Sequence, residues 1–165
     1  MRIIRALIRL AAAYLLCFFV DIMLAAAGGG IMRAICAVCT AAVLVCFMAD
    51  IALKEAGADG KSLRRGVSVS RGGVFAAGAA VTLPSLISWI LLCISALSGS
   101  FGYYGLHKLL NPAFMQFYNI IEPDASSSAL SSSELIAMLP PVFVPAAAYL
   151  LPYFAAMRKK NSDTQ

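Results

Sequence analysis

Residues 28–53 read GGGIMRAICAVCTAAVLVCFMADIAL, and this stretch decides the fold class. After the glycines 28–30, the stretch carries only two charges, on Arg33 and Asp50. A helix crosses the hydrocarbon core of a bilayer with about 20 mostly apolar residues, so the segment is predicted to be a membrane span. Glycine adopts the positive φ angles of tight turns. The glycines therefore predict a sharp outer turn between this span and a preceding one.

Three further segments have the length and composition of a membrane span. Of the 165 residues, 61% are hydrophobic and 13% are charged, whereas soluble domains have about 45–50% apolar and about 25% charged residues. A globule of this size cannot bury that excess, so we expect lipid to be the solvent. The sequence predicts an all-α membrane protein, an up-down bundle of four transmembrane helices in one domain of residues 1–165. The expected spans are 3–27, 31–53, 73–97 and 135–157.

The basic residues predict the orientation. All 13 lysines and arginines except Arg33 and Lys108 lie near the two termini or in the loop 54–72. By the positive-inside rule these regions are cytoplasmic, and an even number of spans also puts both termini on one side. We expect a multi-pass plasma-membrane protein whose loop 98–134 is outside. Topology and attraction to anionic lipid explain the net charge of +5, so no nucleic-acid partner is expected.

The N-terminal segment has a second interpretation. Its basic residues, an apolar core over residues 10–20 and the alanines 25–27 also match a cleavable signal peptide. Cleavage would leave three spans with the same orientation. The apolar stretch runs past about 20 residues, the length of a span, which favours a retained helix.

Asp21 and Arg33 are ionisable residues within the first two predicted spans. They lie on opposite sides of the glycine turn, and at about 1.5 Å rise per residue their heights differ by about 6 Å. Ionisable groups inside a membrane are functional candidates and usually have a partner. One interpretation is an Asp21–Arg33 ion pair. In the other, Arg33 reaches the outer interface, and Asp21 contacts water or a hydroxyl group.

The third span combines hydroxyl groups with a proline. Thr82, Ser85 and Ser88 recur at helical spacing around Pro84, which removes one backbone hydrogen bond. Such hydroxyls either hold neighbouring helices together or line a polar path, and the first role is favoured.

The fourth span is rich in prolines. Pro141, Pro145 and Pro152 fall on one helical face, and Pro140 precedes them. A broken helix within a membrane is tolerated where protein or a water-filled cavity covers its backbone, and transporters use such breaks for binding. Because the other side chains here are nearly all apolar, we predict a packing kink.

The outer loop contains a predicted amphipathic helix. Its apolar residues at 106, 109, 110, 113, 114, 117, 118 and 121 follow helical spacing, and only the Asn111-Pro112 step interrupts them. We expect this helix to lie in the membrane interface or to cap the bundle. A capping box of Ser131 and Glu134 is predicted at the start of the last span.

The pair Cys36 and Cys39 forms a Cys-x-x-Cys motif near the outer end of the second span. With four spans and cytoplasmic termini, this arrangement resembles the quinone-coupled disulfide-bond formation proteins. The resemblance implies that the pair passes electrons to a quinone, with Arg33 as a quinone contact. The outer loop, however, has no cysteine pair to receive electrons from a client protein. Buried cysteine behaves as a small hydrophobe, so we predict that the pair serves packing.

The C-terminal half also resembles a group of small four-span membrane proteins of Gram-positive bacteria. The resemblance rests on the segment YGLHKLLNPAF, residues 104–114, and on the proline-rich last span with Tyr149 and Tyr153. It implies the same four-span topology and carries no activity with it.

Three functions remain open from the sequence. The first is a membrane protein that works by helix association, as a self-associating or accessory subunit. The second is a homo-oligomeric channel or small-solute transporter with Asp21 and Arg33 near its pathway, and the third is the thiol–quinone oxidoreductase. The single histidine and scattered carboxylates give no metal constellation. No catalytic triad or phosphate-binding loop is recognisable, so we expect no cofactor and favour a protein without enzymatic activity.

Overall fold

The computed structural model describes residues 1–25, 29–99 and 101–162, and the regular elements within these ranges are helices. In chain order they are α1 (Arg2–Ala25), α2 (Gly30–Arg64), α3 (Gly72–Ser98), α4 (Tyr104–Leu110), the short 3-10 helix η1 (Pro112–Phe114), α5 (Met115–Ile121), the 3-10 helix η2 (Ser127–Ala129), α6 (Ser132–Ala137) and α7 (Pro140–Ser162).

The prediction of four long apolar helices is confirmed. By length and composition, α1, α2, α3 and the pair α6–α7 can each cross a membrane. The candidate spans are Arg2–Leu24, Gly30–Arg64, Gly72–Ser98 and Ser132–Lys159.

The helix α2 is longer than the sequence predicts. The expected loop 54–72 is wrong for residues 54–64, which continue α2, and only residues 65–71 connect α2 to α3. Charged residues end an apolar span, but they do not end a helix. Glu55 and Asp59 lie one turn apart on the inward face of α2, where both carboxylates accept hydrogen bonds from α7.

Gly29 and Gly99 lie at helix ends and have positive φ angles. Gly29 precedes α2 with φ of +89°, as expected for the predicted turn. Gly28 of that turn, and residues 26 and 27 of the first predicted span, lie outside the described residues. Gly99 follows α3 with φ of +61°, and its N–H donates to the Ser95 carbonyl at 3.0 Å. Left-handed glycines of this kind satisfy carbonyls that a helix leaves without a partner at its end.

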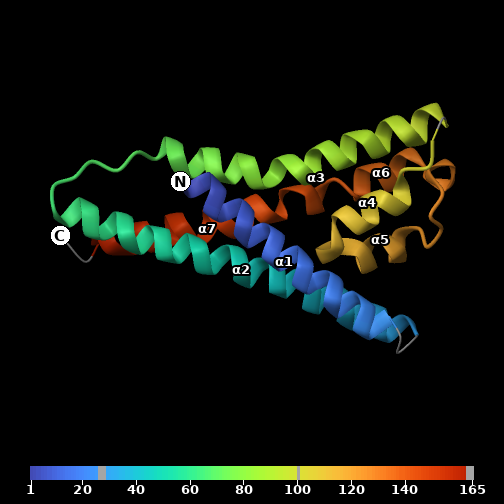
Figure 1. The fold of residues 1–165 in the computed structure, drawn as a ribbon, viewed down its shortest axis with the longest axis horizontal. Helices are drawn as coiled ribbons and strands as arrows, with labels where there is room; N and C mark the ends of the chain where they lie inside the picture. Colours follow the sequence, from blue (N-terminus) through green and yellow to red (C-terminus); the bar gives the residue numbers. More distant parts are fainter. Residues whose placement is uncertain (26–28, 100, 163–165) are drawn as a thin grey trace.

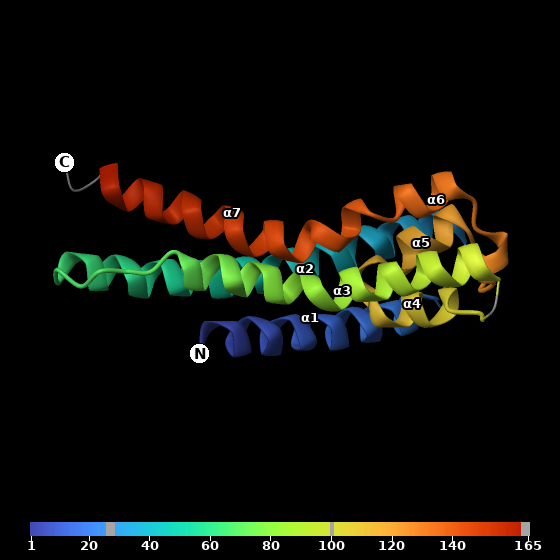
Figure 2. The ribbon, with the colours of Figure 1, turned by 90° about the horizontal axis from the view of Figure 1, so that it is seen from above.

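The long helices form a bundle that is wider at one end. The helices α1 and α2 pack against each other, and α7 packs against α2 and α3 (Figure 1). Toward the tip of the α1–α2 pair, α3 diverges from it, and the segment that holds α4, α5 and α6 lies between them. Figure 2 shows that α2 and α7 extend beyond the start of α1 at the opposite end. The N-terminus and the end of α7 both lie toward that end.

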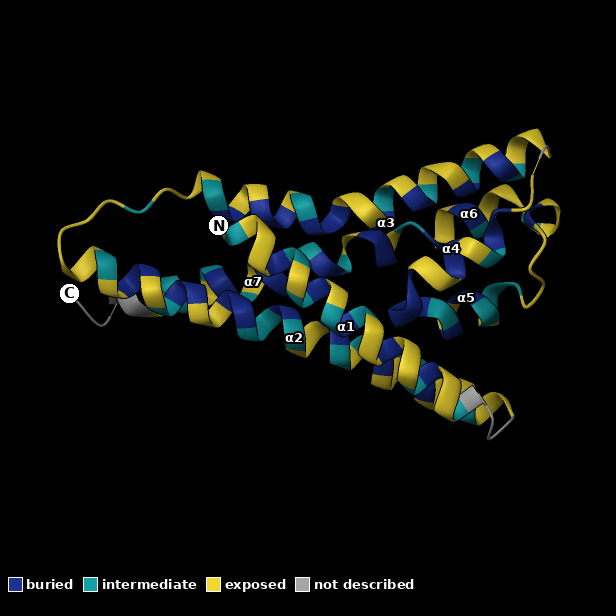
Figure 3. Ribbon diagram, viewed as in Figure 1, coloured by how far each residue is buried: buried dark blue, intermediate teal, exposed yellow. Residues whose placement is uncertain are grey.

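The outside of the bundle carries many large apolar side chains. In α1, Ala6, Ala13 and Cys17 are buried at helical spacing, whereas Phe19 and Met23 are more than half exposed. Figure 3 shows the same division along the long helices, with one face buried and the other exposed. Large exposed apolar surfaces of this kind mark contact with lipid or protein.

The fourth candidate span is interrupted in its first third. The helix α6 ends at Ala137 and α7 begins at Pro140, so the break coincides with the first two prolines. Proline suits the first turn of a helix because its missing N–H has no intrahelical partner there. Pro145 and Pro152 lie within α7 without ending it.

Candidate functional site

The polar face of the segment after α3 is turned into the bundle. His107, Lys108, Asn111 and Gln116 are buried, whereas Leu106 is about half exposed. The predicted amphipathic helix is thus divided into α4, η1 and α5, with the division at the Asn-Pro step. Its polar residues fill the wide end of the bundle, and this end carries the candidate site.

Lys108 joins α4 to the end of α5. Its Nζ donates to the carbonyl oxygens of Glu122 at 2.8 Å, Asp124 at 3.0 Å and Pro123 at 3.4 Å, and lies 4.1 Å from the centre of the Tyr104 ring. These three carbonyls belong to the C-cap of α5 and the two residues after it, and the ammonium gives them a hydrogen-bond donor. Burial lowers the pKa of Lys108, and the nearby Glu122 and Asp124 carboxylates partly oppose that shift.

His107 faces α3 at the centre of a hydrogen-bond network. Its Nδ1 lies 2.9 Å from the Ser88 Oγ, which also accepts hydrogen bonds from the Tyr103 hydroxyl at 3.4 Å and the Asn111 amide at 3.5 Å. The Nε2 atom is buried and has no partner among the described residues. Burial lowers the pKa of His107 to about 4, so the ring is neutral at physiological pH.

Asp21 lies at the junction of α1, α2 and α5 and is fully buried. Its Oδ1 accepts hydrogen bonds from the Cys36 thiol at 3.1 Å and the Gln116 amide at 3.2 Å. Its Oδ2 is buried without a partner in the described part of the chain. Because a buried acceptor without a donor is costly, this junction is the strongest candidate for a site that serves function rather than stability alone.

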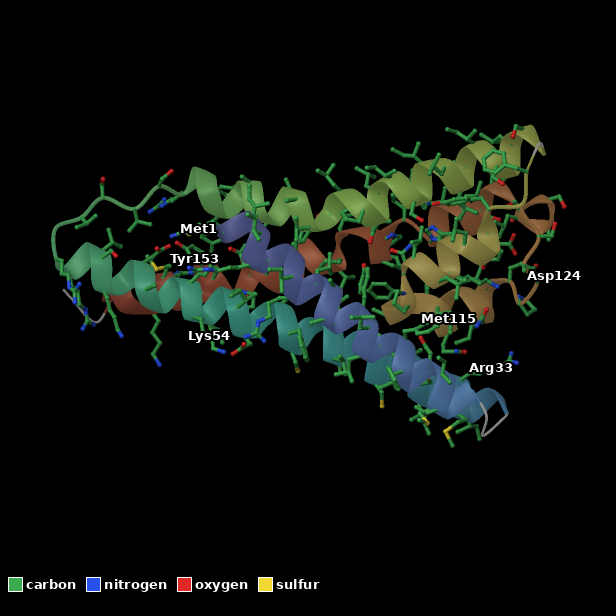
Figure 4. The ribbon with its side chains drawn as sticks, in the orientation of Figure 1. Met1, Arg33, Lys54, Met115, Asp124 and Tyr153 are labelled. Carbon is green, nitrogen blue, oxygen red and sulfur yellow. The ribbon has the colours of Figure 1, made fainter. Side chains whose placement is uncertain are left out.

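Arg33 does not pair with Asp21. The side chain is exposed, and no ion pair involving it occurs among the described residues. Arg33 instead borders a cavity of about 280 Å³ between the α1–α2 turn and α5, together with Gln116 and Asn119. Figure 4 shows Arg33 at the tip of the α1–α2 pair, at the same end as Met115.

Gln116 connects this cavity to the buried carboxylate. Its amide donates to Asp21, and its Oε1 accepts a hydrogen bond from Asn119 at 3.5 Å. The cavity therefore presents a guanidinium and two amides, with a carboxylate behind them. Such a set can bind a small polar molecule that carries hydrogen-bond acceptors.

The three hydroxyl groups predicted on the third span all face inward. Thr82 donates to the Gly78 carbonyl at 3.0 Å, and the Ser85 Oγ lies 2.9 Å from the Tyr14 hydroxyl. Ser88 belongs to the histidine network. The Thr82 bond lies within α3, whereas the bonds of Ser85 and Ser88 join α3 to α1 and to the segment after α3. Because each hydroxyl has a partner within the chain, a role in packing is favoured over a polar path. Pro84 is exposed on the opposite face of α3.

The cysteines of the Cys-x-x-Cys motif point in different directions. Cys36 is buried beside Asp21, whereas Cys39 is exposed, and both are free thiols. A neighbouring carboxylate disfavours the thiolate on which redox exchange depends. The arrangement gives the oxidoreductase interpretation no support. Cys17 is buried and Cys46 is exposed.

Two prolines of the fourth span, Pro140 and Pro141, border an apolar groove. Pro141 and Pro145 are buried, Pro152 is partly buried and Pro140 is exposed. A groove of about 380 Å³ beside the break has walls of alanine, valine, phenylalanine and proline, among them Phe114. Because no polar side chain lines it, the packing interpretation of these prolines is favoured over a substrate site.

A second polar cluster lies at the opposite end and was not foreseen from the sequence. Asp59 binds Arg2 and accepts a hydrogen bond from the Tyr153 hydroxyl, and Glu55 accepts one from Tyr149. Glu55 and Asp59 on α2 are four residues apart, as are their partners Tyr149 and Tyr153 on α7. This matching spacing is the sequence signal that could have revealed the cluster. Near this cluster, the Asp50 carboxylate pairs with the Lys54 ammonium one turn later on α2 at 2.8 Å.

The fold and sites define a helical protein with four helices that are long and apolar enough to cross a membrane. No protein-family model, curated protein or solved structure matches the chain. No group of three or more metal-ligating side chains occurs in the described ranges.

Proposed function

We propose that this chain is a multi-pass plasma-membrane protein with cytoplasmic termini, and that it works by helix association, as a self-associating or accessory subunit of a membrane complex. In this orientation, the end that carries Met1 and Tyr153 in Figure 4 is cytoplasmic, and the end that carries Arg33 and Asp124 is outside. The clustering of basic residues near the termini and the α2–α3 loop supports this orientation.

The observation that carries the proposal is the outward face of α2. Cys39, Ala42 and Cys46 are exposed and Ala49 is partly exposed, in a line at helical spacing. In lipid, helices associate where small residues let their backbones approach closely. On α2 the exposed Val38 and Val45 lie beside this line, whereas the outward face of α1 carries larger side chains, such as Phe19. The line of small residues on α2, which we call the α2 seam, is therefore the favoured contact surface.

The interior of the bundle supports the same conclusion. The hydroxyl groups of α3 are bonded within the chain, as is the Lys108 ammonium. Those interactions stabilise one chain and leave its outer surface to contact partners.

Cross-linking of the native cysteines in intact membranes tests the proposal. A lipid-permeable bifunctional maleimide should join Cys39 or Cys46 across the contact. Self-association yields a product of twice the chain mass, and an accessory role yields a product with another polypeptide. The Cys39→Ser/Cys46→Ser double variant should lose the product, while the matched Cys17→Ser/Cys36→Ser variant should retain it.

A second variant tests whether the α2 seam needs small side chains for close contact. Ala42→Leu should reduce the cross-linked product, because the added side chain prevents close approach. The matched control is Ala11→Leu, on the exposed face of α1. Complete labelling of Cys39 and Cys46 without any cross-linked product would contradict the proposal.

A small-solute transporter is the second candidate, and the cavity beside Arg33 is the observation that favours it. The guanidinium and the amides of Gln116 and Asn119 suit a small carboxylate. Uptake of labelled acetate and glycine into proteoliposomes tests this candidate, with Gln116→Leu expected to abolish it. Uptake no faster than into protein-free liposomes would contradict it.

A further inference from the structure

A partly enclosed pocket of about 310 Å³ lies beside the α2–α3 loop and α7. Its walls include the apolar side chains of Leu63, Val69, Phe154 and Met157, and two arginines, Arg71 and Arg158, border it. We call it the basic pocket. Its volume falls at the lower end of the roughly 300–1,000 Å³ typical of small-molecule sites.

Among the described residues, the carboxylates of Asp50, Glu55 and Asp59 at this end of the bundle have partners other than the two arginines. Asp50 pairs with Lys54 and Arg9, and the other two carboxylates belong to the second polar cluster, where Tyr149 binds Glu55, and Arg2 and Tyr153 bind Asp59. No ion pair of Arg71 or Arg158 occurs among the described residues. Two positive charges therefore border one pocket, and no described carboxylate pairs with either of them.

The start of α3 adds to this positive potential. Arg71 precedes the first residue of this 27-residue helix. The N-terminal end of a helix carries a partial positive charge from its aligned peptide dipoles. An anion placed beside Arg71 would therefore also benefit from the end of α3.

The apolar wall is firmly held. The Phe154 ring lies 5.3 Å from the Phe75 ring and 5.3 Å from the Tyr153 ring, measured between centroids. Tyr153 is in turn held by its hydrogen bond to Asp59. A wall that is rigid before binding loses little conformational entropy when a ligand arrives.

We propose that the basic pocket binds one anionic phospholipid of the cytoplasmic leaflet. Arg71 and Arg158 contact its phosphate, and the first carbons of an acyl chain lie against Phe154 and Met157. Basic pockets between transmembrane helices on the cytoplasmic side suit anionic headgroups. The apolar wall favours a lipid over free phosphate, because free phosphate would gain nothing from Phe154. The lipid site rests on the proposed orientation, but it lies away from the α2 seam and so does not depend on the proposed association.

Native mass spectrometry of the full chain in detergent tests the proposal with two lipids, phosphatidylglycerol and phosphatidylcholine. The wild type should retain one phosphatidylglycerol in preference to phosphatidylcholine. The Arg71→Gln/Arg158→Gln double variant should bind phosphatidylglycerol roughly 25-fold more weakly, at roughly 5-fold per arginine. The matched control is Arg5→Gln/Lys61→Gln, which removes two exposed charges outside the pocket and should leave binding unchanged.

Three results would overturn the proposal. Equal retention of the two lipids would show that the arginines do not select a charge. An equal loss in the control variant would show attraction to overall charge rather than to a site. Displacement of the lipid by millimolar glycerol 3-phosphate would assign the pocket to a free phosphate compound. Retained binding in Arg71→Lys/Arg158→Lys would support the lipid site, since both charges persist.

Discussion

Replacing Lys108 by methionine measures how much one buried ammonium stabilises the wide end of the bundle. Methionine retains most of the apolar stem, and the side chain is only 6% exposed. The substitution removes the donor that three consecutive carbonyls share, those of Glu122, Pro123 and Asp124. It also removes the cation from the face of the Tyr104 ring. The substitution should therefore loosen the contact between α4 and the end of α5.

The magnitude follows from the geometry. The bonds at 2.8 and 3.0 Å count fully and the one at 3.4 Å counts little. A hydrogen bond to a charged group contributes about 1.5–3 kcal/mol, so two such bonds set the upper range. Burial lowers the pKa of Lys108, which means that desolvation of the charge offsets part of this gain. We expect Lys108→Met to lower the free energy of unfolding by about 2 kcal/mol.

Reversible unfolding in mixed micelles of detergent and sodium dodecyl sulfate measures this loss. Trp89, the single tryptophan, donates from Nε1 to the Leu135 carbonyl at 3.0 Å and so reports on the contact between α3 and α6. The control is Lys54→Met, which removes a mostly exposed helix-surface pair and should cost about 0.3–0.5 kcal/mol. If both variants lose the same small amount, the ammonium does not hold α5 and the reasoning is refuted.

Two further predictions concern the same bundle. The pKa of His107 is lowered to about 4, so the unfolded chain binds a proton more readily, and stability should fall by up to about 3 kcal/mol as the pH decreases from 6.5 to 4. His107→Asn should flatten that dependence in thermal unfolding scans, and an unchanged slope would exclude His107 as its source. At Gly78, an added Cβ would lie 3.0 Å from the Leu150 side chain, so Gly78→Val should destabilise the α3–α7 contact by about 1–3 kcal/mol. Leu150→Ala should partly restore the thermal stability of that variant, whereas independent, additive losses would contradict the contact.

Much of the helical architecture could be predicted because its causes are local. A run of apolar residues, a glycine in the left-handed region and a capping box act on their own neighbourhood, so the start of α2 and the Ser131–Glu134 cap were predicted. The far end of α2 was missed because its cause is non-local. Glu55 and Asp59 continue the helix beyond the apolar span, and they find their partners on α7 and at the start of α1.

The candidate site was foreseen only in part. Asp21 was identified because a carboxylate within a span is costly wherever it points. Its partner could not be deduced, since Gln116 lies 95 residues further along the chain. His107 and Lys108 gave no signal of burial, because an amphipathic pattern shows which face is polar without showing what that face contacts.

The sequence by itself determined the four long apolar helices and the charge asymmetry of this protein, because both follow from composition and spacing along the chain. Only the tertiary structure decided where the polar groups go. The wide end of the bundle places α4 and α5 between α3 and the α1–α2 pair, with their polar side chains inward and leucines such as Leu106 outward. Buried polar groups must be hydrogen-bonded, and their partners come from several helices at once. Asp21 is an example, because its carboxylate accepts hydrogen bonds from Cys36 on α2 and Gln116 on α5 and does not pair with Arg33.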